Sequence, residues 1–364
     1  MDKRRVLILG AGKIGSLIAG LLSASKCYEL DLASRRVETA NALVHDLQLD
    51  SVTTHCLDAA DSEAIAELMG HKQFDAVISA LPYHRNTVVA ELAARHGINY
   101  FDLTEDIATT RRIREISDGA DTVFMPQCGL APGFINIVAS DLMGRFTDLD
   151  TVKLRVGALP QTSSNALKYA LLWSTEGVIN EYCEPCEAIV EGEPCTVLPL
   201  EGLESITLDG VAYEAFNTSG GLGNLAQTYK GKVHTLNYKT MRYPGHSQAF
   251  KLLLNDLKLK QDRATLKRIL EHALPTSTQD VVLIYVSASG HRDGVFIEDS
   301  FVRKIYPQQI NGRVWSAIQV ATAAGLCSVL DIVLSDPQQY RGFIPQESIP
   351  LARFMKSPYG HYYA

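Results

Sequence analysis

Three short stretches in the first third of the chain carry side chains that can accept or pass on a proton. Asp102 offers a carboxylate, Cys128 offers a thiol, and Tyr83 and His84 stand side by side. Such groups are the usual carriers of general acid–base catalysis. Each also has a structural interpretation. Asp102 could cap a helix and Cys128 could be a small buried side chain, while the two aromatic residues could line a turn. The four become candidate catalytic residues if the fold brings them together.

A second group of residues, further along the chain, is suited to holding a carboxylate. Thr218 and Ser219 lie where an apolar run meets a glycine pair, a pattern that predicts a strand entering a helix through a capped turn. Free N–H groups in such a turn can bind a carboxylate. Arg242 and His246 follow in a segment with several cations, and a guanidinium can hold a carboxylate with two hydrogen bonds. Plain helix capping and a surface ion pair are the structural alternatives.

Glycine spacing near the start of the chain predicts a dinucleotide site. Gly10, Gly12 and Gly15 follow an apolar run and open a helix-period segment, which is the context that makes this pattern specific. The first glycine permits a tight turn, the second lets the pyrophosphate approach the backbone, and the third lets helix and strand pack closely. The helix amino terminus, with Lys13 and Ile14, adds partial positive charge for the phosphates. We expect the end of the fourth apolar run to contribute to the same site through Ser79, Ala80 and Leu81.

Two residues after the second apolar run indicate which nucleotide is bound. A ribose 2′-hydroxyl is usually bound by Asp or Glu at this place, but the chain has Ser34 and Arg35. A hydroxyl and a guanidinium suit a 2′-phosphate, through charge-assisted hydrogen bonds. The sequence therefore favours NADP(H). NAD(H) is the alternative if the arginine only begins a solvated helix.

Hydrophobic periodicity indicates the elements that would position these residues. Six short apolar runs alternate with segments of 3.6-residue spacing, which is typical of a parallel sheet with right-handed helical crossovers. The fold class predicted is α/β, a Rossmann doubly wound parallel sheet. Because ligands bind beyond the carboxyl ends of such strands, the ends of the fourth, fifth and sixth strands should meet beside the cofactor. The expected strands are 6–9, 30–33, 52–55, 76–79, 99–101 and 122–125.

After about residue 128 the pattern changes. Longer alternating segments, such as 151–156 and 281–286, predict a second, α+β domain with a mixed or antiparallel sheet. An apolar segment over 313–334 predicts a buried helix that returns to the first domain. We expect a dinucleotide-binding domain, a substrate and dimerisation domain, and a C-terminal helix and tail, over 1–128, 129–310 and 311–364.

Composition excludes several classes of protein. The net charge, 34 − 41 = −7, argues against a general nucleic-acid or anionic-membrane binder. No apolar stretch reaches the roughly 18 residues of a membrane span, and the first apolar run is too short for a signal peptide. Seven cysteines, an odd number, favour a reducing compartment over a disulfide framework, so we expect a cytoplasmic protein. Cys183, Cys186 and Cys195 resemble half of a zinc site, but nothing completes it, and no metal is predicted.

The sequence resembles the saccharopine dehydrogenase family, especially its lysine 6-dehydrogenase branch, from the glycine loop to about residue 335. The most specific similarities are segments 129–136, 214–221 and 238–246. The resemblance implies a Rossmann domain, an α+β substrate and dimer domain, and oxidation of a C–N bond by a pyridine nucleotide. Saccharopine-cleaving members are longer and usually carry Asp at the position of Ala131, which favours a smaller substrate such as lysine. Cys128 matches the Cys-Gly that some saccharopine-cleaving members carry before this motif, so saccharopine stays open.

For an enzyme of this kind, the substrate nitrogen must lose a proton before hydride can leave. A lysine ammonium has a pKa of about 10.4, so its deprotonation at pH 7 costs roughly 4.6 kcal/mol. We expect Asp102 to act electrostatically with the other three candidates in a proton relay, and Arg242 and the Thr218–Ser219 turn to fix the α-carboxylate. The alternatives are a saccharopine dehydrogenase, another secondary-amine reductase such as a carboxynorspermidine dehydrogenase, and an NADP-sensing protein without catalysis. We expect a homodimer or a larger homo-oligomer.

Overall fold

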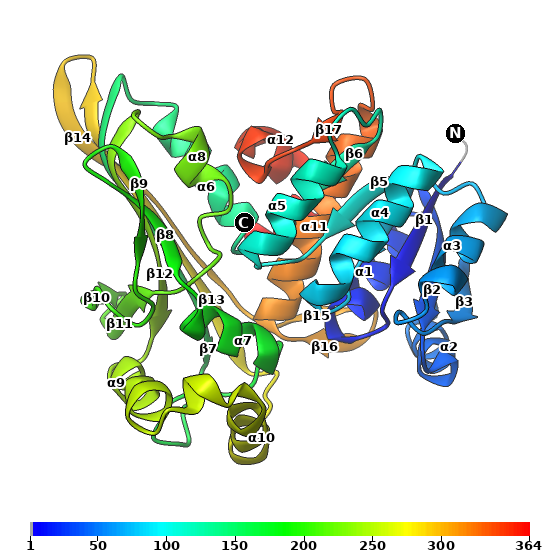
Figure 1. The fold of residues 1–364 in the computed structure, drawn as a ribbon, viewed down its shortest axis with the longest axis horizontal. Coiled ribbons are helices and arrows are strands. Elements are labelled where there is room, and N and C mark those ends of the chain that lie inside the picture. Colours follow the sequence, from blue (N-terminus) through cyan, green and yellow to red (C-terminus); the bar gives the residue numbers. More distant parts are fainter. Residues whose placement is uncertain (1–2) are drawn as a thin grey trace. The chain divides into compact units, whose positions relative to one another are not determined.

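The computed structural model describes residues 3–364, and the chain divides into two compact units. The first unit comprises Met1–Phe134, Gln309–Val314 and Gln319–Ala364, and the second comprises Ile135–Gln308 and Trp315–Ile318. Each unit has its own sheet (Figure 1).

The first unit contains a parallel sheet of seven strands in the order β17-β6-β5-β4-β1-β2-β3. Six of these strands were predicted from apolar runs, and they are confirmed to within two residues at their ends. The seventh strand, β17, has two residues and comes from the C-terminal part of the chain, where no apolar run predicts a strand. The strands are β1 (Arg4–Leu9), β2 (Tyr28–Ser34), β3 (Val52–Cys56), β4 (Ala76–Ser79), β5 (Asn99–Asp102), β6 (Val123–Met125) and β17 (Gly342–Phe343).

Helices connect these strands as right-handed crossovers require. The side chain of Asp61 accepts from the backbone N–H groups of Glu63 and Ala64 and is the N-cap of α3. The helices between the strands are α1 (Lys13–Ala24), α2 (Val37–Asp46), α3 (Ser62–His71), α4 (Asn86–His96) and α5 (Ile107–Ile116), with a 3-10 turn η1 (Tyr83–Arg85) before α4. The C-terminal part adds α11 (Ala317–Ser335), η4 (Gln346–Ser348), α12 (Leu351–Lys356) and η5 (Gly360–Tyr363).

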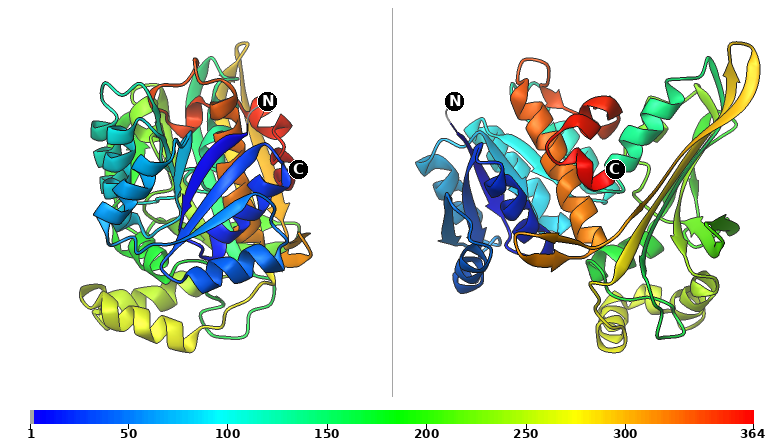
Figure 2. Two further views of the ribbon diagram at one scale, coloured as in Figure 1. Left: turned by 90° about the vertical axis from the view of Figure 1, so that its right-hand side faces the viewer. Right: turned by 180° about the vertical axis from the view of Figure 1, so that it is seen from behind.

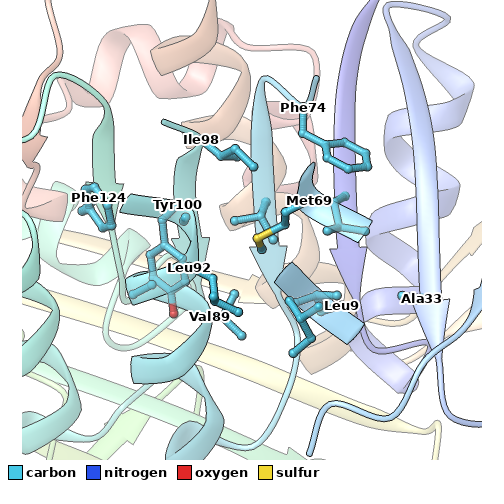
Figure 3. Close-up of a cluster of buried hydrophobic side chains, with 14 of the residues drawn as sticks. Leu9, Ala33, Met69, Phe74, Val89, Leu92, Ile98, Tyr100 and Phe124 are labelled. Atoms are coloured by element: carbon cyan, nitrogen blue, oxygen red, sulfur yellow. The ribbon is translucent and has the colours of Figure 1, made fainter. Parts of the chain in front are cut away.

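Apolar side chains fill the space between this sheet and its helices. Figure 3 shows Leu9, Val89 and Tyr100 in one cluster, together with Met69 of α3 and Phe74. All five side chains are buried. Burying apolar surface at this scale stabilises the strands in one register, so the residues at their carboxyl ends are held in fixed positions.

The second unit is built on an eight-stranded mixed sheet. Its main path runs β10-β11-β12-β7-β13-β14, with β8 and β9 branching from β12. The pairing of β12 with β7 is parallel and the other pairings are antiparallel, which confirms the predicted mixed sheet. Figure 2 shows β13 and β14 as a long hairpin. The strands are β7 (Asp148–Pro160), β8 (Cys186–Val190), β9 (Glu193–Val197), β10 (Glu204–Leu208), β11 (Val211–Asn217), β12 (Val233–Arg242), β13 (Asp280–Arg292) and β14 (Val295–Ile305).

Several helices of the second unit share an apolar core at one end of this sheet. Tyr182, Phe250 and Leu270, from three different helices, are buried in one cluster with Phe216 of β11. The helices are α6 (Phe134–Met143), α7 (Thr175–Cys183), α8 (Leu225–Thr228), α9 (His246–Lys251) and α10 (Arg263–Ala273), with a π-helical turn η2 (Leu252–Asp256) and a 3-10 turn η3 (Leu259–Gln261).

The predicted long apolar helix is α11, which begins later than expected. Residues Arg313–Trp315 form strand β16, paired with β15 (Gln308–Ile310), so the helix starts at Ala317. In the part of the chain that the structure describes, α11 alone has the length and composition of a membrane span, and 78% of its apolar window is buried. Asp331 accepts a hydrogen bond from the Tyr28 hydroxyl of β2 at 2.7 Å, which gives the one charge in this apolar helix a partner.

Candidate active site

The glycine loop between β1 and α1 has the close approaches that a dinucleotide cradle needs. Gly10 has φ +106°, and a Cβ there would lie 2.8 Å from the carbonyl oxygen of Ala80. A Cβ on Gly15 would lie 1.9 Å from the carbonyl oxygen of Gly10. A Cβ on Gly12 would meet nothing within 4 Å, so there is open space above the residue that the pyrophosphate should approach. The loop therefore fits the phosphates of a dinucleotide.

The other predicted cofactor residues lie around this loop. Lys13 and Ile14 form the first turn of α1, which carries no acidic residue and no side-chain cap that would compete for its N–H groups. Ala80 donates its N–H to Leu9 at 2.9 Å, and the Leu81 side chain comes within 3.4 Å of the Cβ position of Gly10. The end of β4 is thus brought beside the glycine loop, as predicted.

Ser34 and Arg35 stand at the carboxyl end of β2. The Ser34 side chain is half-buried and its Oγ accepts from the N–H of Arg36, while Arg35 is exposed. Neither residue places a carboxylate here, where it would repel a 2′-phosphate. The residues present therefore fit NADP(H).

Ends of the three strands β4, β5 and β6 are joined by buried hydrogen bonds. Ser79 Oγ donates to the side-chain oxygen of Asn86 at 2.7 Å, and Tyr100 donates to the Asp102 carboxylate at 2.7 Å. The N–H groups of Gln127 and Cys128, after β6, bond to the carboxylate and to the carbonyl of Asp102 at 3.0 and 2.9 Å. The predicted convergence of these three strand ends is therefore present in the first unit.

Asp102 lies at the centre of this network and has no exposed surface. One carboxylate oxygen accepts from the N–H groups of Thr104 and Gln127, and the other accepts from the Tyr100 hydroxyl. Burial raises the pKa of Asp102 to about 6, although these hydrogen bonds act in the opposite direction. In this geometry the carboxylate orders the loops after β5 and β6, a role that the sequence pattern does not reveal.

Cys128 is also buried, with 1% of its surface exposed. Its thiol donates to the Met125 carbonyl at 3.0 Å and accepts from Nε2 of Gln346 at 3.2 Å. Burial, followed by the charge of Asp102, raises the pKa of the Cys128 thiol, so it is held neutral.

Tyr83 and His84 lie in the 3-10 turn η1, with the two rings edge to face at 5.9 Å. Tyr83 is half-buried and His84 is exposed. The phenol and the imidazole therefore lie at the surface of the first unit, whereas Asp102 and Cys128 lie inside it.

One acidic residue in this region was not among the predicted site residues. Glu105 follows Asp102 by three positions, and its side chain is half-buried at the carboxyl end of β5. Burial, with smaller contributions from the charges of Asp106 and Asp102, raises the pKa of Glu105 to about 7. Its position at a strand end was a signal in the sequence, but the catalytic role was predicted for Asp102 instead.

The second unit contains a buried cation in an aromatic environment. Arg242, 2% exposed, ends β12, and its Nε donates to the Tyr182 hydroxyl at 2.9 Å while Nη1 donates to the Met241 carbonyl. The guanidinium carbon lies 5.0 Å from the ring centre of Tyr169 and 5.9 Å from that of Tyr182. The Tyr169 hydroxyl is buried and makes no hydrogen bond of ordinary geometry among the described residues, and the Arg242 guanidinium and Trp173 are neighbours that interact with it.

His246 supports this cation through Tyr182. Its Nδ1 lies 2.7 Å from the Leu167 carbonyl and must donate to it, so Nε2 accepts from the Tyr182 hydroxyl at 3.0 Å. Burial, together with the charge of Arg242, lowers the pKa of His246 to about 3. The imidazole is therefore neutral and fully hydrogen-bonded, and its ring orders Tyr182.

The capped turn predicted after β11 is not formed as expected. Thr218 Oγ1 bonds to Thr240 at 2.7 Å, and the Ser219 N–H donates to the Glu181 carbonyl. The next helix, α8, has four residues, begins six positions after Ser219, and its N-cap makes no side-chain hydrogen bond. A Cβ on Gly221 would lie 2.3 Å from the Tyr238 ring, so the backbone packs directly against this ring and only glycine fits there. Thr218 and Ser219 instead lie buried beside the strand that carries Arg242.

The three cysteines that resemble half a metal site are divided between elements. Cys183 ends α7, Cys186 begins β8, and Cys195 lies on β9 opposite Ala188. Burial raises the pKa of the Cys183 and Cys186 thiols, which disfavours the thiolate form that a metal requires. Within residues 3–364 no group of three or more His, Cys, Asp or Glu side chains is arranged to hold a metal ion.

Two family models match successive parts of the chain. Residues 6–122 match the saccharopine dehydrogenase NADP binding domain, and residues 129–344 match the saccharopine dehydrogenase C-terminal domain. The chain is 27% identical over 259 residues to the mitochondrial alpha-aminoadipic semialdehyde synthase of Mus musculus, covering 68% of this chain and 27% of that protein. The matched region thus spans about a quarter of the length of that relative.

Two further comparisons cover more of the relative. The NADP(+)-dependent, L-glutamate-forming saccharopine dehydrogenase of Pyricularia oryzae is 23% identical over 304 residues, covering 80% of this chain and 66% of that protein. In fold, the chain is similar to the apo L-Glu-forming saccharopine dehydrogenase of Saccharomyces cerevisiae, with a TM-score of 0.76, 18% identity, and coverage of 97% and 96%. The chain belongs to the saccharopine dehydrogenase family, with that family's NADP-binding domain over residues 6–122 followed by its C-terminal domain.

Proposed function

We propose that this protein is an NADP-dependent dehydrogenase that oxidises a C–N bond of an amino acid of the lysine or saccharopine kind. The observation that carries the proposal is Arg242, a guanidinium buried against the aromatic ring of Tyr169. A cation held in this way can bind an anionic group of a small ligand. Substrates of this kind have an α-carboxylate.

The NADP-binding domain would supply the redox chemistry. The glycine loop and the first turn of α1 would hold the pyrophosphate, and Ser34 and Arg35 would contact the 2′-phosphate. When bound, the nucleotide would supply the hydride acceptor for this oxidation. Asp102, sealed among its three donors, would keep the loops after β5 and β6 in one arrangement during this reaction.

The second unit has residues suited to the anionic group of an amino acid. Arg242 would take the α-carboxylate, oriented by Tyr182, which is itself held by His246. Because His246 is neutral, it adds no second positive charge, and because it is fully hydrogen-bonded, it keeps the guanidinium in one orientation. We infer that His246, Thr218 and Ser219 help to position the carboxylate site and do not contact the substrate themselves.

Within this class we favour the ε-amine of L-lysine as the group oxidised. The support is the residue at position 131, where this chain has Ala and saccharopine-cleaving members usually have Asp. Saccharopine is the second candidate, because two kinds of relative to which the chain is similar are a saccharopine dehydrogenase and an alpha-aminoadipic semialdehyde synthase.

A panel of amino acids tests the proposal directly. Reduction of NADP+ and of NAD+ would be followed at 340 nm with L-lysine, saccharopine, ornithine and other diamino acids. We expect turnover with NADP+ and lysine. Turnover with saccharopine alone would transfer the assignment to the second candidate. A panel without any turnover, combined with tight NADP+ binding, would contradict the enzyme and support a nucleotide sensor.

A further inference from the structure

The loop between β5 and α5 has three carboxylates with different environments. Asp102 is sealed, because both of its oxygens accept hydrogen bonds from buried groups. Asp106 accepts from the N–H of Thr109 at 2.7 Å and is the N-cap of α5. Both side chains therefore have structural roles. Glu105 lies between them in the sequence, and its side chain neither caps a helix nor joins two loops.

The backbone around Glu105 is held firmly. Thr104 donates its N–H to Asp102 at 2.9 Å, and its Oγ1 accepts from the N–H of Asp106 at 3.1 Å. Glu105 is thus fixed on both sides by hydrogen bonds of its neighbours. Its half-buried side chain follows the carboxyl end of β5, in the part of the sheet where β4, β5 and β6 end together. In open α/β sheets this edge is where ligands and chemistry are found.

The charges near Glu105 are acidic. Asp102, at the end of β5, and Asp106, at the start of α5, are the charged side chains that act on it, and both favour its protonated form. Among the described residues, no cation forms an ion pair with the Glu105 carboxylate that would hold it permanently ionised. Burial adds to these effects and brings the pKa of Glu105 to about 7, so the carboxyl gains and loses a proton near neutral pH.

We propose that Glu105 is the proton acceptor for the substrate amine, and that Asp102 is a positioning residue that holds the Glu105 loop. This inference rests on the proposed function. The step breaks one N–H bond of the substrate ammonium and forms one O–H bond on the Glu105 carboxylate, which leaves a neutral amine with a free electron pair. No electrons are lost or gained in this transfer. The free pair is what allows the adjacent carbon to release hydride afterwards.

The test compares Glu105→Gln with Glu115→Gln. Glu115 lies on α5 at the surface, in an ion pair with Arg112 at 2.9 Å, so its replacement controls for the loss of one carboxylate nearby. Two readouts are needed. One is the pH profile of turnover. The other needs neither substrate nor nucleotide: a water-soluble carbodiimide with glycine ethyl ester labels protonated carboxyls, and peptide mass spectrometry then measures labelling at each glutamate.

We expect Glu105→Gln to lower kcat by about 10²- to 10⁴-fold while NADP+ binding stays unchanged, since general base catalysis contributes about this much. The acidic limb of the wild-type profile should disappear in this variant and persist in Glu115→Gln. At pH 7 Glu105 should be labelled several-fold faster than Glu115. If the wild-type enzyme turns over and Glu105→Gln has the same pH profile as wild type, the role of Glu105 would be overturned and the proposed function would stand. The same conclusion would follow if Glu105 were labelled no faster than Glu115. A wild-type enzyme that oxidises no amine in the panel would overturn the proposed function as well.

Discussion

At the residue scale, two glycines of the cofactor loop differ in the space that a side chain would have. Gly15 is enclosed, because the Gly10 carbonyl occupies the place of its side chain. Gly12 is open on the side where a Cβ would point, and its φ of −78° is available to any residue. The fold therefore requires glycine at position 15, while only a bound nucleotide requires it at position 12.

We expect Gly12→Ala to unfold at the wild-type temperature without nucleotide and to bind NADP+ at least tenfold more weakly, because the new methyl group would occupy the pyrophosphate's space. Gly15→Ala should instead lose about 1–3 kcal/mol of stability through overpacking. Thermal unfolding with and without NADP+ measures both effects. Wild-type NADP+ affinity in Gly12→Ala would show that the pyrophosphate does not lie against this residue.

Arg242 is the residue on which the substrate assignment depends. Arg242→Lys keeps the charge but removes the planar fork, so the KM for the amino acid should rise about 10- to 100-fold. The Kd for NADP+ should not change, because the nucleotide contacts lie in the first unit. Arg145→Lys, at an exposed ion pair with Asp141 and Asp299, is the matched control in the second unit. An unchanged KM in Arg242→Lys would remove this residue from the substrate site.

At the element scale, α11 depends on a carboxylate that is distant in sequence. The first N–H groups of this helix, from Ala317 and Ile318, donate to Asp280 at 2.6 and 3.0 Å. Asp280 begins β13 and has no exposed surface, and burial raises its pKa to about 6. A strand from one part of the chain therefore determines where the long helix begins.

This arrangement predicts a pH-dependent cost for Asp280→Ala. At neutral pH the lost cap should lower the unfolding free energy by about 1–2 kcal/mol. The folded-state pKa lies above the unfolded value, so native Asp280 binds its proton more tightly and wild-type stability from this group increases as the pH falls from 7 towards 4.

The difference between wild type and Asp280→Ala should therefore widen on acidification, by about 1–1.5 kcal/mol at pH 5 and by more at lower pH. Urea unfolding followed by tryptophan fluorescence at pH 5 and pH 7.5 measures this difference, with buried Trp315 close to the helix start as the reporter. A difference that is the same at both pH values would contradict the raised pKa.

At the scale of the whole molecule, the C-terminal part of the chain completes the first unit. β17 adds a strand beside β6, and Gln346 donates to the carbonyl of Pro126 and to Cys128. Tyr363 is fully buried, with its ring centre 3.9 Å from that of Phe134 and its hydroxyl bonded to the Ala321 carbonyl. The segment around 126–134 therefore has its structure fixed by residues more than 200 positions later.

We expect Tyr363→Ala to lower the unfolding free energy of the first unit by about 3–5 kcal/mol, as for other large buried aromatic residues. Tyr362→Ala, at the half-buried neighbouring position, should have a much smaller effect. Denaturant unfolding of both variants, with NADP+ affinity as a second readout, tests this difference. A loss in Tyr363→Ala that is as small as the one expected for Tyr362→Ala would show that Tyr363 does not contribute to the core of the first unit.

Much of the first unit could be predicted from the sequence, because each of its signals is contained within a short segment of the chain. Most of the strands β1 to β6 contain a short apolar run, and the helix-period segments between them predict crossovers. The spacing of Gly10, Gly12 and Gly15 fixes a turn of known shape, and Ser34 and Arg35 follow from their place after the second strand. The same locality explains why the mixed sheet of the second unit was predictable as a class, while the order of its strands was not.

Only the tertiary structure decided what the site residues do, because their partners are remote or their environment is collective. Tyr182 and Arg242 are 60 positions apart, and nothing in either segment signals the contact. Asp102 looks like a reactive carboxylate in sequence, but packing seals it, and the same packing leaves Glu105 half-buried and without an ion pair among the described residues. Burial and hydrogen-bond saturation are properties of the assembled fold, so residue type and spacing name the candidates and the fold assigns their roles.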